Sequence, residues 1–95
     1  MFDLNNLLPE HFENLLGSSM TIDGTEHSLI IEAVDLIKSP SPRGQPFSVK
    51  LRAPAGTTGV QGIYHLVHPE LGVMGIFLVP VELSKGSQLF EAVFN

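Results

Sequence analysis

Residues 61–81 read QGIYHLVHPELGVMGIFLVPV, in which two apolar runs flank the segment HPELG at residues 68–72. Apolar runs of strand length on either side of a turn that contains Pro and Gly are typical of a β-hairpin. The short connection favours antiparallel pairing, and we place Leu66 opposite Met74. This hairpin is the best-defined element of the sequence, and the other segments are interpreted around it.

The hairpin is apolar on both of its faces. One face carries a set that the last run of the chain extends: Tyr64, Leu66, Met74, Ile76, Leu78, Phe90, Ala92 and Phe94. The opposite face carries a second set: Ile63, His65, Val67, Val73, Phe77, Val79, Leu89, Glu91 and Val93. A small barrel has only one interior, and proteins rarely leave a large contiguous apolar area exposed. The second set must therefore be covered by an N-terminal helix, by the long loops or by another molecule.

The other strand patterns occupy residues 19–23, 28–38, 47–53 and 88–94, which brings the expected number of strands to six. Glu32 and Asp35 interrupt the alternation in the second of these segments, and this predicts a β-bulge near Ala33. Loops rich in Pro, Gly, Ser and Thr are expected at residues 39–46 and 54–59.

Residues 6–16 have helical periodicity, with one apolar face formed by Leu8, Phe12, Leu15 and Leu16. Asn6 suits the N-cap, Pro9 the first turn and Gly17 the C-terminal stop. A helix this short must pack its apolar face on the rest of the chain. We expect residues 1–95 to form a single, mainly β domain: a small antiparallel barrel or roll of about six strands with one short N-terminal helix.

The composition excludes several classes of function. The 95 residues include ten acidic and five basic side chains, so a binder of nucleic acid or of an anionic membrane is not expected. The chain has no cysteine, and thiolate metal sites and thiol nucleophiles are therefore ruled out. No basic N-terminal region or apolar run of about 20 residues is present, which predicts a soluble protein, cytoplasmic or part of an assembled particle.

The histidines do not form a metal-binding pattern. His65 and His68 are close in sequence, but residues three apart on a strand point to opposite faces and do not chelate one ion. For His68 we expect an imidazole hydrogen bond that holds the turn at Pro69. The sequence thus predicts no metal site.

Carboxylates, serines and glycines give no catalytic pattern either. A three-residue loop after residue 83 would pair Glu82 with Gln88 and Glu91 with Val79, so the two acids would lie on opposite faces. No serine lies in a Gly-x-Ser-x-Gly elbow, and the segment GTTG at residues 56–59 lacks the Lys-Ser/Thr of a phosphate-binding loop. We therefore expect a protein that is not an enzyme and that has no cofactor.

Three segments also resemble a known family: QGIYHLVHPELG at residues 61–72, FLVPV at 77–81 and FEAVFN at 90–95. The pattern is similar to that of a family of uncharacterised bacterial proteins of about this length, associated with phage-tail or tail-collar-like genes. This resemblance implies a whole small protein with a possible place in a particle, and it implies no established activity.

Two hypotheses of function follow. The first is a non-enzymatic protein-interaction or assembly module, phage-tail or particle associated, that binds a partner or itself through Ile63, His65, Val67, Phe77, Val79, Leu89 and Val93. The second is a small ligand-binding or hydrolytic β-barrel with a pocket near Tyr64, His65 and His68, beside the loops at 39–46 and 54–59.

Overall fold

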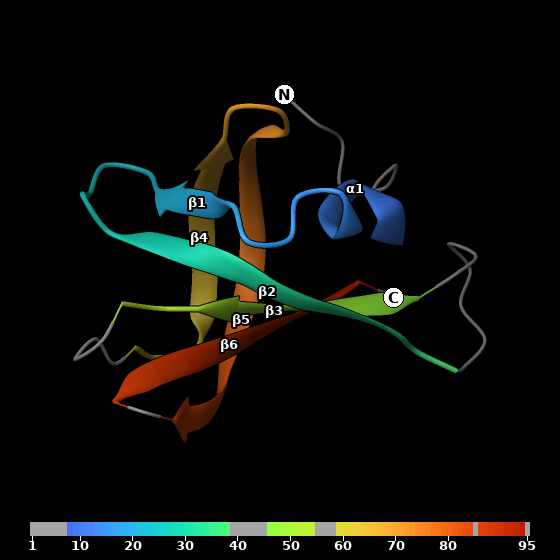
Figure 1. The fold of residues 1–95 in the computed structure, drawn as a ribbon. Helices are drawn as coiled ribbons and strands as arrows, with labels where there is room; N and C mark the ends of the chain where they lie inside the picture. The colour runs from blue at the N-terminus through green and yellow to red at the C-terminus, as the bar shows by residue number, and fades with distance from the viewer. Residues whose placement is uncertain (1–7, 39–45, 55–58, 85, 95) are drawn as a thin grey trace.

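Six strands in residues 8–38, 46–54, 59–84 and 86–94, the part of the chain that the computed structural model describes, close into an antiparallel barrel (Figure 1). The strands are β1 (Ser19–Ile22), β2 (Ser28–Leu36), β3 (Phe47–Arg52), β4 (Gly62–His68), β5 (Gly72–Ser84) and β6 (Ser87–Phe94). The predicted small barrel of about six strands is confirmed. Most of the two predicted loops, residues 39–45 and 55–58, lies outside the described residues.

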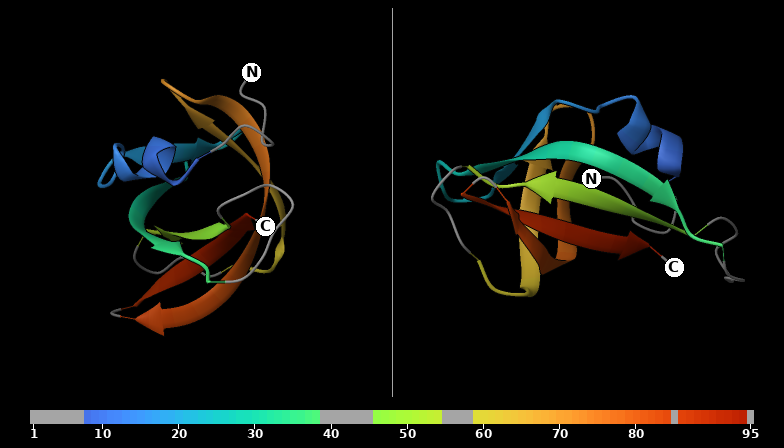
Figure 2. Two further views of the ribbon diagram at one scale, coloured as in Figure 1. Left: turned by 90° about the vertical axis from the view of Figure 1, so that its right-hand side faces the viewer. Right: turned by 60° about the horizontal axis from the view of Figure 1, so that its bottom comes forward.

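The strand order around the barrel is β1-β2-β3-β6-β5-β4, and β4 pairs with β1. The first three strands and the last three strands are therefore two meanders that enclose one interior (Figure 2). Two seams join them, β3 with β6 and β1 with β4, and every pair is antiparallel.

The β4–β5 hairpin has the predicted register, with Leu66 opposite Met74 and Ile63 opposite Phe77. Gly72 ends the turn with φ 78°, a left-handed conformation that a glycine adopts without a steric cost. Alternation along the two strands then sends one apolar set into the barrel and the other to its outside.

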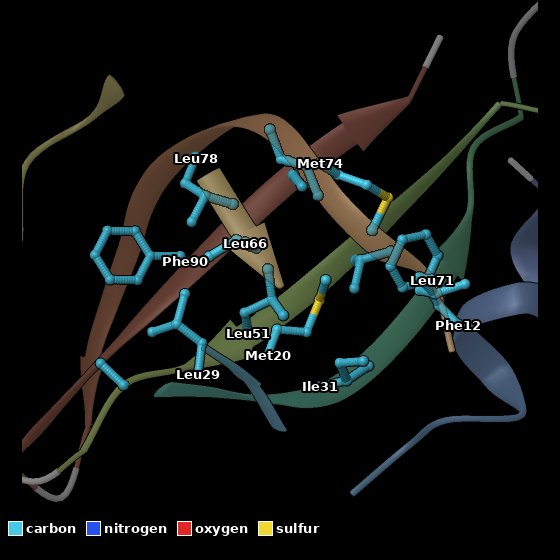
Figure 3. Packing of buried hydrophobic residues seen from close by; sticks show 14 of the residues in the cluster. Phe12, Met20, Leu29, Ile31, Leu51, Leu66, Leu71, Met74, Leu78 and Phe90 are labelled. Atoms are coloured by element: carbon cyan, nitrogen blue, oxygen red, sulfur yellow. The ribbon is translucent and has the colours of Figure 1, made fainter. Parts of the chain in front are cut away.

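The interior is filled by large apolar side chains from every strand (Figure 3). Its buried members include Met20, Leu29, Ile31, Val49, Leu51, Leu66, Met74, Ile76, Leu78 and Phe90. The apolar set that includes Tyr64, Leu66 and Met74 thus faces the inside of the barrel. Its burial supplies the main favourable free energy of folding, at about 25 cal/mol per Å² of apolar surface removed from water.

Helix α1 (Pro9–Glu13) closes one end of the barrel. Its buried Phe12 packs against Phe47 and Phe94, with ring centroids 6.1 Å and 5.6 Å away. The helix is shorter than the predicted 6–16, although Pro9 lies in its first turn as expected; the predicted cap Asn6 lies outside the described residues. Because α1 contacts β2 and β3, this helix, one of the three covers considered for the outer face of the hairpin, does not cover it.

Two β-bulges set which side chains point outward. The predicted bulge near Ala33 is confirmed by a register shift between Ile31 and Ala33. A second shift, between Pro80 and Glu82, was not predicted, and it places Glu82 opposite Leu89 instead of Gln88. Since Leu89 and Glu91 are two residues apart, Glu82 and Glu91 lie on the same outer face, not on opposite faces as expected.

Candidate functional site

The outer side of the β4–β5 hairpin is an exposed apolar surface, which we call the hairpin face. It consists of the outward side chains Ile63, His65, Val67, Val73, Phe77 and Val79. Ile63 and Phe77 are directly opposed across the two strands, and their exposed fractions are 68% and 52%. An adjacent pair of large apolar side chains therefore remains in contact with water.

The centre of the hairpin face is shallow because Gly75 has no side chain there. His65 lies opposite Gly75, and its ring atom Nε2 is 3.5 Å from the position that a Cβ atom of Gly75 would occupy. Cγ2 of Ile63 is 3.6 Å from the same position. The side chains of Ile63 and His65 thus lie over the glycine and form a low, continuous surface.

The two predicted interaction residues on β6 have different surroundings. Val93 is 49% exposed, as expected for an outward side chain. Leu89 is only 4% exposed, so the prediction that it belongs to an interaction surface is wrong. Its register partners are Arg52 on β3 and Glu82 on β5, and long charged side chains cover apolar neighbours with their aliphatic stems.

The outer surface formed by β2, β3 and β6 is charged. Nε of Arg52 is 2.7 Å from Oε1 of Glu32, and Nζ of Lys50 is 3.0 Å from Oδ2 of Asp35 and 3.9 Å from Oε2 of Glu91. The hydrogen bond to Asp35 raises the pKa of Lys50, and the hydrogen bond to Glu32 raises the pKa of Arg52. This cluster was not predicted, because its members are far apart in sequence and the bulges decide which of them meet.

A second histidine links the hairpin turn to the segment after α1. The buried His68 accepts a hydrogen bond at Nδ1 from the backbone N–H of Glu70, 3.0 Å away, so the predicted turn-holding role of this imidazole is confirmed. Its proton is therefore on Nε2, which lies 3.1 Å from Oγ of Ser18. Ser18 in turn donates to the carbonyl oxygen of Leu15.

This arrangement does not match a Ser–His catalytic pair. A general base needs an unprotonated nitrogen toward the serine hydroxyl and an acidic partner at its other nitrogen. Here Nε2 of His68 donates toward Ser18, and Nδ1 faces a backbone donor. The contact connects two segments of the fold and does not activate the hydroxyl.

A pocket lies at the end of the barrel opposite α1. Its volume is about 230 Å³. It is lined by Ile22, His27, Leu29, Ala53, Pro54, Gly59, Tyr64 and Phe90. The rings of Tyr64 and Phe90 are 5.8 Å apart and tilted by 59°, and the Tyr64 hydroxyl donates to the carbonyl oxygen of Val60.

Of the three residues predicted to share a pocket, only Tyr64 lines this one. His65 is on the hairpin face, outside the barrel. His68 is at the other end, where the turn adjoins α1. Tyr64 and His65 are neighbours on one strand, so alternation alone predicts that their side chains point to opposite faces. The place of His27 in the pocket was not predictable, because it depends on how the β1–β2 turn folds over the barrel end.

Another concave surface lies between α1 and the hairpin turn, lined by His11, Asn14, Leu15, Glu70 and Leu71. Within the described ranges, no three His, Cys, Asp or Glu side chains come together as ligands for a metal ion. Nor is any helix of those ranges long and apolar enough to cross a membrane.

The comparisons with known proteins agree with the sequence resemblance at a coarse level. Neither a curated protein nor a solved structure matches this chain. One family model matches residues 7–94, which is nearly the whole barrel with its helix. The chain therefore belongs to the family described as "Domain of unknown function (DUF6916)".

Proposed function

We propose that this protein is a non-enzymatic interaction module whose hairpin face binds the hairpin face of a second copy of the same chain. The observation that carries the proposal is the exposure of Ile63 and Phe77 side by side on the outside of the barrel. Full burial of such a side chain contributes about 1.5–3 kcal/mol, and because Ile63 and Phe77 are 68% and 52% exposed, covering each of them stabilises a complex by roughly 1–2 kcal/mol. No helix of the described chain covers them, because α1 packs at the barrel end.

The charge distribution supports a second copy as the partner. No member of the hairpin face is Asp, Glu, Lys or Arg, while the ion pairs of Lys50 and Arg52 lie on another side of the barrel. Each copy has a formal net charge of −5, so two copies repel each other, and an interface without charged side chains adds no local repulsion to that of the net charge. A neutral face lets two acidic molecules meet without burying an unpaired charge.

The shape of the hairpin face also suits a two-fold contact. In an isologous interface each residue meets the same patch of the partner, which requires a surface that is complementary to itself. The low centre at Gly75, bordered by Phe77 and Val73, allows the two hairpins to approach closely. Thr21 on β1, opposite Val67, extends the uncharged area on one side, and on the other side Val79 lies opposite Glu91 of β6.

We further propose that this self-association serves the assembly of a multi-protein particle. The resemblance to proteins associated with phage-tail genes supports that role, because such particles are built from repeated copies. The protein would then act in the cytoplasm until it is incorporated.

Mass in solution tests the proposal. We expect the wild-type chain to be a dimer in analytical ultracentrifugation, and Phe77→Ser or Ile63→Ser to raise the dissociation constant about 10- to 100-fold. The fold of these variants should remain, because both side chains are exposed and contribute little to the core.

Ile30→Ser is the matched control. Ile30 has a similar exposed fraction, 48%, but it lies opposite Arg52 on the charged side of the barrel. Its replacement should leave the dissociation constant unchanged. A wild-type chain that stays monomeric at all concentrations would contradict the proposal, and so would a loss of folding instead of association in Phe77→Ser.

A further inference from the structure

The pocket at the end of the barrel opposite α1 is distinct from the hairpin face in position and in chemistry. It opens between the end of β1 with the following turn, which contribute Ile22 and His27, and the segments that flank β3 and β4. Its walls are the apolar side chains of Leu29, Ala53 and Phe90, all buried. The hairpin face can therefore be occupied or mutated without altering these walls.

We propose that this pocket binds a small neutral aromatic molecule that carries one hydrogen-bond donor, with Tyr64 and Phe90 packing on its ring and His27 accepting the hydrogen bond. The mouth of a small β-barrel is a common place for such a ligand. The proposal does not depend on the self-association described above.

The size of the pocket limits the ligand to one or two rings. An apolar cavity of roughly 150 Å³ is sufficient for benzene. The pocket here has about 230 Å³, so a fused bicyclic ring fits and a long acyl chain does not. Gly59 contributes to this space, because a Cβ atom on it would collide with the ring of Phe90.

The walls favour an aromatic over an aliphatic occupant. Tyr64 and Phe90 are tilted by 59° with centroids 5.8 Å apart, so the pair offers a ring face and a ring edge to the same space. Aromatic rings prefer edge-to-face or offset contacts of this kind. The Tyr64 hydroxyl donates a hydrogen bond to the Val60 carbonyl oxygen, which fixes the position of the ring. The ring therefore serves as one wall of the pocket.

The lining also determines the charge of the ligand. None of the eight lining residues is Asp, Glu, Lys or Arg, and an ion would lose its hydration there without gaining a partner. His27 contributes the only imidazole among the lining residues, and within the described residues no hydrogen bond to that ring is present. A neutral imidazole nitrogen accepts a hydrogen bond from a ring N–H or a phenolic O–H.

Indole and indene are a suitable pair of probes, because they have nearly the same shape and only indole has an N–H donor. We would titrate each into the ¹⁵N-labelled wild-type chain and follow the amide shifts of pocket residues by NMR. Indole should bind about fivefold to tenfold more tightly than indene, corresponding to one net hydrogen bond. Tyr64 is the only tyrosine of the chain, and its ring resonances give an independent report on the pocket.

Two variants and one control make the experiment decisive. In His27→Ala the preference for indole over indene should disappear, and in Ala53→Leu both probes should bind at least tenfold more weakly because the new side chain fills the pocket. His65→Ala removes an exposed imidazole from the hairpin face and should change neither affinity. Shifts confined to the hairpin face, equal affinity for the two probes in the wild-type chain, or a preference retained in His27→Ala would overturn the proposal.

Discussion

Gly59 lies so close to Phe90 that its backbone has no room for a side chain. A Cβ atom built on Gly59 would be 2.5 Å from Cζ of the Phe90 ring. We expect Gly59→Ala to lower the free energy of unfolding by about 1–3 kcal/mol, because an overpacked site forces the buried ring or the backbone to move. Urea unfolding followed by circular dichroism measures this change.

Gly62→Ala is the matched control for that substitution. Gly62 is at the start of β4, three residues further along the chain, and a Cβ atom there would meet no atom within 4 Å. Its replacement should change the free energy of unfolding by less than about 0.5 kcal/mol, as is usual at surface positions. Equal losses in the two variants would show that the contact with Phe90 is not the cause.

At the same scale, the sequence indicated the roles of some residues and not of others. His68 was assigned to the turn correctly, since a histidine before Pro69 has few local partners other than the turn backbone. The burial of Leu89 was missed, because it depends on Arg52 and Glu82, which belong to other strands. The local sequence predicts hydrogen bonds between residues close in the chain. The exposure of a side chain depends also on its neighbours on the adjacent strands.

The ion pair between β2 and β3 gives the fold a pH dependence at alkaline pH. The hydrogen bond to Asp35 raises the pKa of Lys50 above its ordinary value of 10.5. A raised pKa means that the charged lysine stabilises the fold fully below that value, and that this contribution is lost as the pH rises through the folded-state pKa.

Lys50→Met should therefore lower the free energy of unfolding by about 0.2–1 kcal/mol at neutral pH, the usual range for a partly exposed pair. The difference between wild type and variant should shrink as the pH rises above 10.5 and through the raised pKa of Lys50, as measured by urea unfolding at each pH. Lys38→Met is the control, since the exposed Lys38 has no ion pair in the described part of the chain. A difference that stays constant across that range would contradict the assignment.

The elements themselves were predicted unevenly, for physical reasons. The β4–β5 hairpin was placed in the correct register because a tight turn and strict alternation leave one arrangement that buries Leu66 and Met74. The β5–β6 pairing was wrong near Glu82, since a bulge adds one residue without any change in hydrophobic pattern. The packing partner of the helix was not predictable, because periodicity identifies the apolar face of the helix but not the partner of Phe12, which is Phe47.

At the scale of the whole molecule, apolar and charged surfaces lie on different sides of one barrel. If two hairpin faces form the proposed dimer, each copy brings a net charge of −5, and repulsion between the copies opposes association. Raising the ionic strength from about 0.02 M to about 0.5 M screens that repulsion and should lower the dissociation constant. Analytical ultracentrifugation at several salt concentrations measures the effect, and a dimer that weakens with salt would instead indicate an interface built on ion pairs.

The barrel class itself was predictable because six short apolar runs and short connections leave few ways to bury the chain in a single domain. The pocket was only partly predictable. Tyr64 was identified as a lining residue, but His27 and Ala53 come from elements that the strand order brings together at the barrel end. The candidate site thus depends on closure of the sheet, which no single segment determines.

That closure also limits the ways in which a partner can be recognised. Each described strand has a hydrogen-bonded neighbour on both sides over at least part of its length, so no described strand lies wholly at a sheet edge with its backbone N–H and C=O groups open to an incoming peptide. The weakest seam is β1 with β4, where only Thr21–Val67 and Ile22–Leu66 are paired. Where the strands are paired on both sides, a partner can be recognised only through side chains, and the edge-to-edge pairing that leads to amyloid is blocked.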